Sequence, residues 1–190
     1  GAVQSVVAPQ PMVLPLLGVG VLAMILARGP VRMLGGALVF AAALAWVLPA
    51  RPALLIADQG QIVGLMGPEG RALSKSGAAF VAGNWLEADG DGASVAEAAA
   101  RPAFSGPKGQ RRAQFNGRAL VHLSGKAGLA GLAAACRDGA LVVIDKPAPD
   151  GAWSGCDLWD PPRLRQTGAL AFDAKGRMRS TLGQSARLWD

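Results

Sequence analysis

The first 27 residues carry no charged side chain, and this feature limits most strongly how the chain can fold. Residues 1–50 contain two charges, Arg28 and Arg32, whereas residues 51–190 hold 17 basic and 13 acidic residues, a net charge of +4. With 51% hydrophobic residues overall, the chain is unlike a disordered protein, which needs low hydrophobicity and high charge. The division predicts a membrane segment over 1–50 and a soluble domain over 51–190.

Two apolar runs occupy the first 50 residues. We expect membrane spans at about 7–27 and 33–50, because a helix that crosses a bilayer needs roughly 20 mostly apolar residues. Two buried helices of a soluble all-α core are an alternative, which the absence of a polar stripe disfavours. A signal peptide is another, but no basic region precedes the first run. Small residues let helices approach closely in lipid, and those expected to do so are Gly18, Gly20, Gly35 and Gly36.

The short loop between the two runs sets the expected orientation. Only Arg28–Arg32 joins the spans, so the helices must form a tight antiparallel hairpin. Two arginines without an acidic residue place such a loop in the cytoplasm. Residues 51–190 would then lie in the periplasm of a bacterial inner membrane, which makes the chain a multi-pass membrane protein. Gly1 in place of methionine predicts a fragment or a processed product.

Short apolar runs alternate with turn residues in the rest of the chain. The predicted strands lie at 53–57, 61–66, 112–115, 118–123, 140–144, 168–172 and 177–181. The predicted helices lie at 78–88, 95–100 and 129–136, and residues 146–160 are predicted to form a loop. This alternation predicts an α/β or α+β class, built as layers around a sheet.

Three local patterns carry much of this prediction. Asn116-Gly117 lies between two predicted strands and favours a two-residue hairpin turn, because both positions need positive φ. Ser94 and Glu97 have the spacing of a capping box at a helix start. In the helix at 78–88 we expect Phe80, Val81 and Trp85 to form the apolar side.

His122 is the only histidine in the chain. It alternates with Val121 and Leu123 on a predicted strand, so we expect it to point to the less buried face. One histidine cannot supply the imidazoles of a zinc hydrolase site, and no G-x-S-x-G motif accompanies it. We therefore predict no catalytic residue, no metal ligand and no cofactor.

The two cysteines, Cys136 and Cys156, flank the predicted strand at 140–144. In the periplasm their pairing is chemically favoured and would stabilise the domain by about 3 kcal/mol. Two free buried thiols are the alternative, because spacing alone does not bring two Cα atoms within bonding range. We favour the disulfide.

Basic residues gather in two segments of the soluble part, and such patches can neutralise nucleic-acid phosphates. The candidates for nucleic-acid binding are Lys108, Arg111, Arg112, Arg163 and Arg165. Aromatic platforms for stacking bases are sparse, since tyrosine is absent and Trp153 and Trp159 lie alone in a loop. A basic surface facing anionic lipid headgroups is an equally good interpretation.

Four segments resemble the C-terminal end of the ComEC family, the bacterial inner-membrane proteins of DNA uptake in natural transformation. They are ALLIADQGQIVGLMGPEGRAL, AGNWLEADGD, AACRDGALVVIDKPAPDGAWSGC and RQTGALAFDAKGRMRST. The resemblance covers nearly the whole chain and implies a last membrane hairpin followed by a metallo-β-lactamase-like domain. It also implies the partners: the inner membrane, the remaining transmembrane core of the same protein, and a single DNA strand.

The sequence departs from the family at the metal site. The H-x-H-x-D-H motif is absent, and Asp145-Lys146-Pro147 follows the strand where the nuclease-type domain has paired histidines. The resemblance therefore implies a degenerate domain that has lost its metals and guides DNA or braces the channel. Two alternatives remain: a hydrolase with nonstandard ligands at Asp145, Asp150 and Asp157, and an unrelated membrane-tethered structural module.

Overall fold

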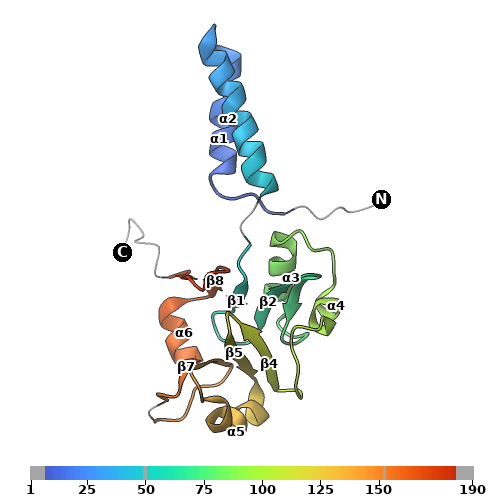
Figure 1. The fold of residues 1–190 in the computed structure, drawn as a ribbon, viewed down its shortest axis with the longest axis vertical. Helices are drawn as coiled ribbons and strands as arrows, with labels where there is room; N and C mark the ends of the chain where they lie inside the picture. Colours follow the sequence, from blue (N-terminus) through green and yellow to red (C-terminus); the bar gives the residue numbers. More distant parts are fainter. Residues whose placement is uncertain (1–6, 49–50, 152, 183–190) are drawn as a thin grey trace. The chain divides into compact units, whose positions relative to one another are not determined.

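A computed structural model describes residues 7–48, 51–151 and 153–182, and these form two compact units. One unit holds helices α1 and α2, and the other holds two β-sheets with their helices (Figure 1). Residues 49 and 50, at the end of the second expected span, lie outside the described residues, as do residues 183–190 of the expected soluble domain.

The apolar segment forms a helical hairpin of α1 (Val13–Leu26) and α2 (Pro30–Val47). Helix α2, at 18 residues, is long and apolar enough to cross a membrane, by length and composition. Helix α1 has 14 residues, about 21 Å, and falls below the usual minimum of about 17 residues. It is shorter than the expected span at 7–27 because Pro9 and Pro11 disfavour helical conformation in the residues before them.

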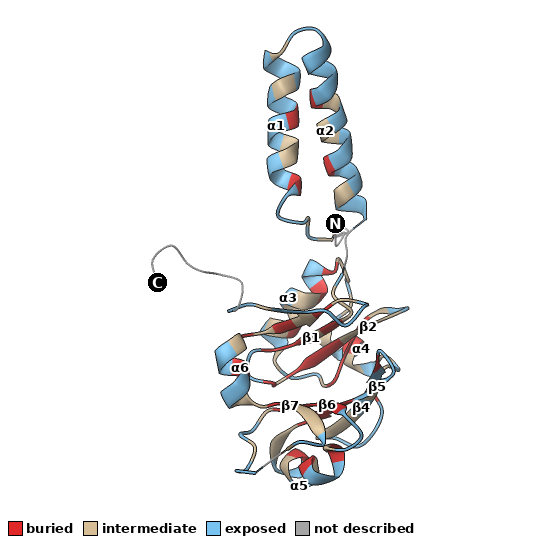
Figure 2. Cartoon of the chain, turned by 60° about the vertical axis from the view of Figure 1, so that its left-hand side comes forward, coloured by how far each residue is buried: buried red, intermediate tan, exposed pale blue. Residues whose placement is uncertain are grey.

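The two helices meet at a pair of glycines. A Cβ atom on Gly20 would lie 2.9 Å from the carbonyl oxygen of Gly35, and one on Gly35 would lie 2.8 Å from that of Gly20. Gly18 and Gly36 would meet nothing within 4 Å. Two of the four expected glycines therefore form the close approach, while most other hairpin side chains are exposed (Figure 2).

The second unit contains two sheets. The first has the order β3-β2-β1-β8-β9 and is antiparallel throughout. Its strands are β1 (Leu54–Ile56), β2 (Val63–Gly67), β3 (Gly70–Leu73), β8 (Leu170–Phe172) and β9 (Met178–Ser180). The second has the order β4-β5-β6-β7, with β5, β6 and β7 parallel and β4 antiparallel to β5. Its strands are β4 (Gln110–Phe115), β5 (Arg118–Leu123), β6 (Ala140–Ile144) and β7 (Cys156–Trp159).

Helices α3 (Ala79–Ala88) and α4 (Val95–Ala100) cover the outer face of the first sheet, and α5 (Gly125–Ala135) covers that of the second. Helix α6 (Pro161–Thr167) instead contributes Leu164 to the core between the sheets. Alternate residues of β6 show the layering, since Leu141 and Val143 pack with β1 in the core between the sheets. Val142 packs in another core with Leu132 of α5. A third core holds Leu73 together with residues of α3 and α4. The order of layers is thus helix, sheet, sheet and helix (Figure 2).

Several local predictions are confirmed. Asn116 and Gly117 have φ values of 49° and 73° and join β4 to β5. Ser94 and Glu97 form both hydrogen bonds of the capping box at the start of α4. The run at 140–144 is a parallel strand buried along its whole length.

Other predictions are wrong in detail. The segment 146–160 is not only a loop, because β7 lies within it and α6 follows directly. Two sheets are present where layers around one sheet were expected. Helix α3 buries Ala82 and Leu86, spaced one turn apart, and leaves Phe80 82% exposed. Val81 and Trp85 are partly buried against the same core as Ala82 and Leu86, so the expected apolar side of this helix is wrong for Phe80 alone.

Candidate functional site

An open groove lies at one edge of the second sheet. Strands β5 and β6 are parallel neighbours, so their carboxyl ends reach the same edge, where open α/β sheets usually bind ligands. Ser124 follows β5 and Asp145 follows β6, and both line the groove. The loop after β3 and the start of β4 complete it, and its volume is about 740 Å³.

The charged residues that line the groove are Lys75, Lys108, Arg111, Lys126 and Asp145. Four cations and one carboxylate give this lining a formal net charge of +3. We call it the basic groove. Lysine ammonium groups and arginine guanidinium groups are the usual partners of phosphate oxygens. The groove can therefore hold an anionic backbone.

Close backbone contacts fix two walls of the basic groove. The amide of Ser124 donates to the carbonyl of Gly109 at 2.8 Å, which ties the end of β5 to the start of β4. A Cβ on Gly109, where φ is +87°, would lie 3.0 Å from the carbonyl oxygen of Ser124. A Cβ on Gly128 would lie 2.8 Å from the backbone of Leu123. Only glycine allows this approach, so the glycines around α5 position the site.

Arg111 is held by the loop that precedes β4. Its Nη1 donates to the carbonyl of Gly106 at 2.8 Å and its Nη2 to that of Phe104 at 3.0 Å. The guanidinium thus orders the loop while its positive charge remains beside the groove.

Asp145 is the only carboxylate among the described residues that line the groove. Its Oδ1 accepts a hydrogen bond from the amide of Gly125 at 2.8 Å, at the start of α5. Its Oδ2 accepts one from Lys75 Nζ at 3.4 Å. The side chain is 18% exposed, so this ion pair is partly shielded from solvent.

Of the five residues predicted to bind nucleic acid, the structure brings only Lys108 and Arg111 together in the groove. Arg112 is the next residue on β4, so it points to the opposite side, and it lines a separate pocket with Leu65. Arg163 lies in α6, where it donates to Asp157 at 2.9 Å and stacks 3.6 Å from the ring centroid of Trp159.

Arg165 also lies in α6 and is exposed. Sequence reasoning missed Lys75 and Lys126, which complete the groove. They come from separate segments and belong to no basic run, so no local signal could have found them.

His122 is buried, with 1% of its surface exposed, and the expectation of a less buried face is wrong. Val121 and Leu123 pack in the core with α5, so His122 points toward the first sheet. Its Nε2 lies 3.0 Å from the carbonyl oxygen of Gly60, in the turn between β1 and β2. Burial lowers the pKa of His122 to about 4, although the hydrogen bond to Gly60 opposes that shift. The ring is therefore neutral near pH 7.

The three aspartates proposed as nonstandard metal ligands do not come together. Within residues 7–48, 51–151 and 153–182, no group of three or more His, Cys, Asp or Glu residues could hold a metal ion. Asp145 binds Lys75 and Gly125, and Asp157 binds Arg163. The described part of the chain thus offers no assembled ligand set.

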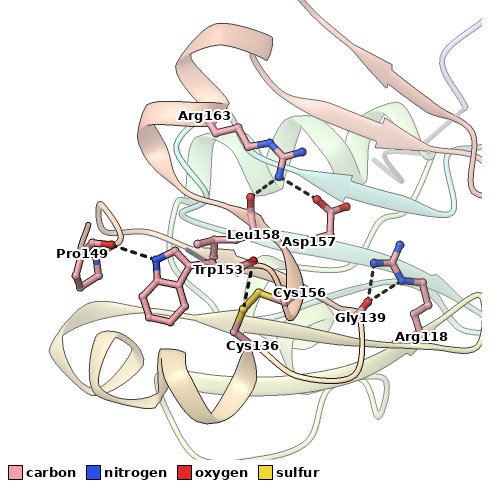
Figure 3. Close-up of a disulfide and its surroundings, with 9 residues drawn as sticks. All are labelled: Arg118, Cys136, Gly139, Pro149, Trp153, Cys156, Asp157, Leu158 and Arg163. Atoms are coloured by element: carbon pink, nitrogen blue, oxygen red, sulfur yellow. Dashed lines mark hydrogen bonds and ion pairs between the residues drawn. A yellow bond between two sulfur atoms is a disulfide. The ribbon is translucent and has the colours of Figure 1, made fainter. Parts of the chain in front are cut away.

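The two cysteines form a disulfide (Figure 3). Cys136 at the C-cap of α5 is joined to Cys156 at the start of β7, with Sγ atoms 1.97 Å apart and Cα atoms 4.8 Å apart. Trp153 packs against the same core, and its indole N–H donates to the carbonyl of Pro149. The disulfide joins the end of α5 to β7, the strand that pairs with β6.

Comparisons of the chain with models of protein families, with curated proteins and with solved structures found no match. Any function assigned to the chain therefore rests on its own residues and geometry. The basic groove and the apolar hairpin are the two features that bear on it.

Proposed function

We propose that this chain is part of an inner-membrane DNA-uptake protein of the ComEC type, and that its soluble domain guides DNA without catalysing a reaction. The basic groove is the observation that carries the proposal. Its lining has a net charge of +3 and opens along the edge where β5 and β6 end. Such a groove favours a phosphodiester backbone over an uncharged ligand.

The architecture supports a relation to metallo-β-lactamase-like domains. Two sheets packed face to face, with helices on both outer faces, are the layers expected of such a domain. His122 lies buried between the sheets, and its Nε2 is 3.0 Å from the carbonyl oxygen of Gly60. The layers are the observation that supports our proposal of a degenerate domain of this kind.

The hairpin supports a membrane location. Helix α2 is long enough to span a bilayer, and α1 packs closely against it at Gly20 and Gly35. With Arg28 and Arg32 in the loop, the positive-inside rule places that loop in the cytoplasm. The soluble domain then lies in the periplasm, where it meets incoming DNA before the strand reaches the membrane core.

Fluorescence anisotropy tests the DNA-guiding role. The whole chain, in micelles of an uncharged detergent, is titrated with a labelled single-stranded oligonucleotide of mixed sequence at several salt concentrations. Each phosphate contact contributes about −0.7 to the log–log slope of affinity against salt. The double variant Lys108→Ala/Lys126→Ala should therefore flatten the slope by about 1.4 units, without a change in sequence preference.

A matched control removes two cations outside the groove. Arg165→Ala/Lys175→Ala changes the net charge equally, at two exposed positions, and should leave the slope nearly unchanged. Absence of DNA binding at low salt would overturn the DNA-guiding role, as would equal effects of the two double variants. Binding of a fluorescent short-chain phosphatidylglycerol that is weakened in Lys108→Ala/Lys126→Ala, together with an absence of oligonucleotide binding, would assign the groove to lipid headgroups instead.

A further inference from the structure

We propose that Asp145 is an internal counter-anion of the basic groove. Its carboxylate occupies the position that a DNA phosphate would take, and it thereby lowers the affinity of the groove for the DNA backbone. The inference rests on the proposed function, because it takes DNA as the ligand of the groove. The inference goes beyond that function because it assigns to one residue the control of DNA affinity and DNA release.

The contacts of Asp145 are those that a phosphate would make. One oxygen accepts from the ammonium group of Lys75 and the other from the backbone amide of Gly125. Ammonium groups and backbone amides are also the donors that bind phosphate oxygens in protein–DNA complexes. A phosphate that enters this part of the groove must therefore compete with the carboxylate for both donors.

The backbone holds the carboxylate in this position. The amide of Asp145 donates to the carbonyl of Leu123 at 3.2 Å, which fixes the end of β6 beside the end of β5. All five residues of β6 are buried, so the strand that carries Asp145 is firmly packed. The anion is thus built into the groove by the fold, rather than placed there by a mobile loop.

The charge balance shows what this anion does. Asp145 neutralises Lys75, and the guanidinium of Arg111 is engaged by two carbonyls, which leaves the ammonium groups of Lys108 and Lys126 exposed to a ligand. A strand that must move through the groove has to be released as readily as it is captured. A carboxylate that competes with phosphate makes release easier, because it binds the ammonium group of Lys75 and the amide of Gly125 again when the phosphate leaves.

Replacing Asp145 with asparagine tests the proposal in the anisotropy assay described above. The amide oxygen of Asn still accepts from Gly125, while the loss of charge frees Lys75 for phosphate. We expect Asp145→Asn to bind the oligonucleotide about tenfold more tightly, since a hydrogen bond to a charged group is worth about that factor. The log–log salt slope should steepen by about 0.7.

Asp157→Asn is the matched control, because it removes an equal charge from a carboxylate that is paired with Arg163 outside the groove. We expect it to change the affinity by less than about twofold, because salt screens the interaction between the DNA and a charge outside the groove. The double variant Lys75→Gln/Asp145→Asn restores the net charge of the lining to +3 without the freed ammonium. Its affinity should return to within about twofold of the wild type.

The outcomes separate this inference from the proposed function. Equal affinities of Asp145→Asn and the wild type would overturn it, as would a gain matched by Asp157→Asn. If the Lys108→Ala/Lys126→Ala variant still weakens binding in that case, the groove remains a DNA site and only the counter-anion role falls. Absence of DNA binding by every variant would overturn both. Asp145→Ser serves as a second test of the charge, should the asparagine variant fail to fold.

Discussion

Acid should destabilise the soluble unit through a single buried ring, that of His122. Burial is the largest cause that lowers its folded pKa to about 4, and Lys75 lowers it further, whereas Gly60 and Asp145 raise it. In the unfolded chain the ring titrates near its ordinary value of about 6.5. Between these two values the unfolded state binds more protons than the folded state. Stability is therefore complete above about pH 6.5 and is lost as the pH falls toward about 4.

The size of the effect follows from the two pKa values. A difference of roughly 2.5 units corresponds to about 3 kcal/mol when the ring is protonated in both states. At pH 5, where only the unfolded chain is largely protonated, the loss is about 2 kcal/mol. With an m-value of about 2 kcal/mol per molar urea for a domain of this size, the unfolding midpoint should fall by about 1 M.

Urea unfolding of the chain, followed by tryptophan fluorescence at pH 7.5, 6 and 5, measures this shift. The His122→Gln variant provides the reference, because its amide can donate to Gly60 and does not titrate. Carboxylates titrate alike in both proteins, so the difference between the two pH profiles isolates the histidine. Parallel profiles for the wild type and the variant would refute the reasoning.

Four further predictions concern the disulfide, the hairpin, metals and topology. Cys136→Ala/Cys156→Ala should lower unfolding stability by about 3 kcal/mol, because the bond closes a loop with a sequence separation of 20; an unchanged urea midpoint would contradict this. Gly35→Leu should push α1 and α2 apart, whereas Gly36→Leu, which meets open space, should leave spin-label distances between the helices unchanged. Elemental analysis should find no stoichiometric zinc, and DNA should stay intact; chelator-sensitive cleavage would show a metallonuclease. A cysteine placed within 29–31 should resist a membrane-impermeant thiol reagent in intact spheroplasts and should react once the membrane is permeabilised. Labelling before permeabilisation would reverse the proposed orientation.

The features that could be predicted from the sequence depend on neighbouring residues. The turn at Asn116-Gly117 needs positive φ at two adjacent positions, and the capping box needs only Ser94 and Glu97. The β6 strand is a continuous apolar run because both of its faces are covered. In each case the residues that decide the structure lie within a few positions of one another.

The features that were missed depend on distant segments. Leu54 of β1 pairs with Phe172 of β8, so the first sheet joins the two ends of the soluble unit, and no local pattern announces that partnership. The environment of His122 depends on the turn at Gly60 and on the sheet that carries it. Strand β7 has only four residues, and α6, which begins with two prolines, follows it. The conformations of β7 and α6 depend on the segments that pack around them, so their own residues do not predict them.

The basic groove combines a rigid frame with cations that come from separate segments. Strand β6 is fully buried, and the disulfide joins the segments on either side of it, so the backbone that carries Asp145 has little freedom to move. In the proposed exchange between the carboxylate and a phosphate, we therefore expect side chains to rotate while the sheet stays unchanged. Rotamer changes of exposed side chains are far faster than collective rearrangements of packed elements. The proposal therefore predicts that charge and salt, rather than a change of fold, set the affinity of the groove for DNA. The slope of log affinity against log salt concentration is for this reason the measurement that should distinguish Asp145→Asn from the wild type.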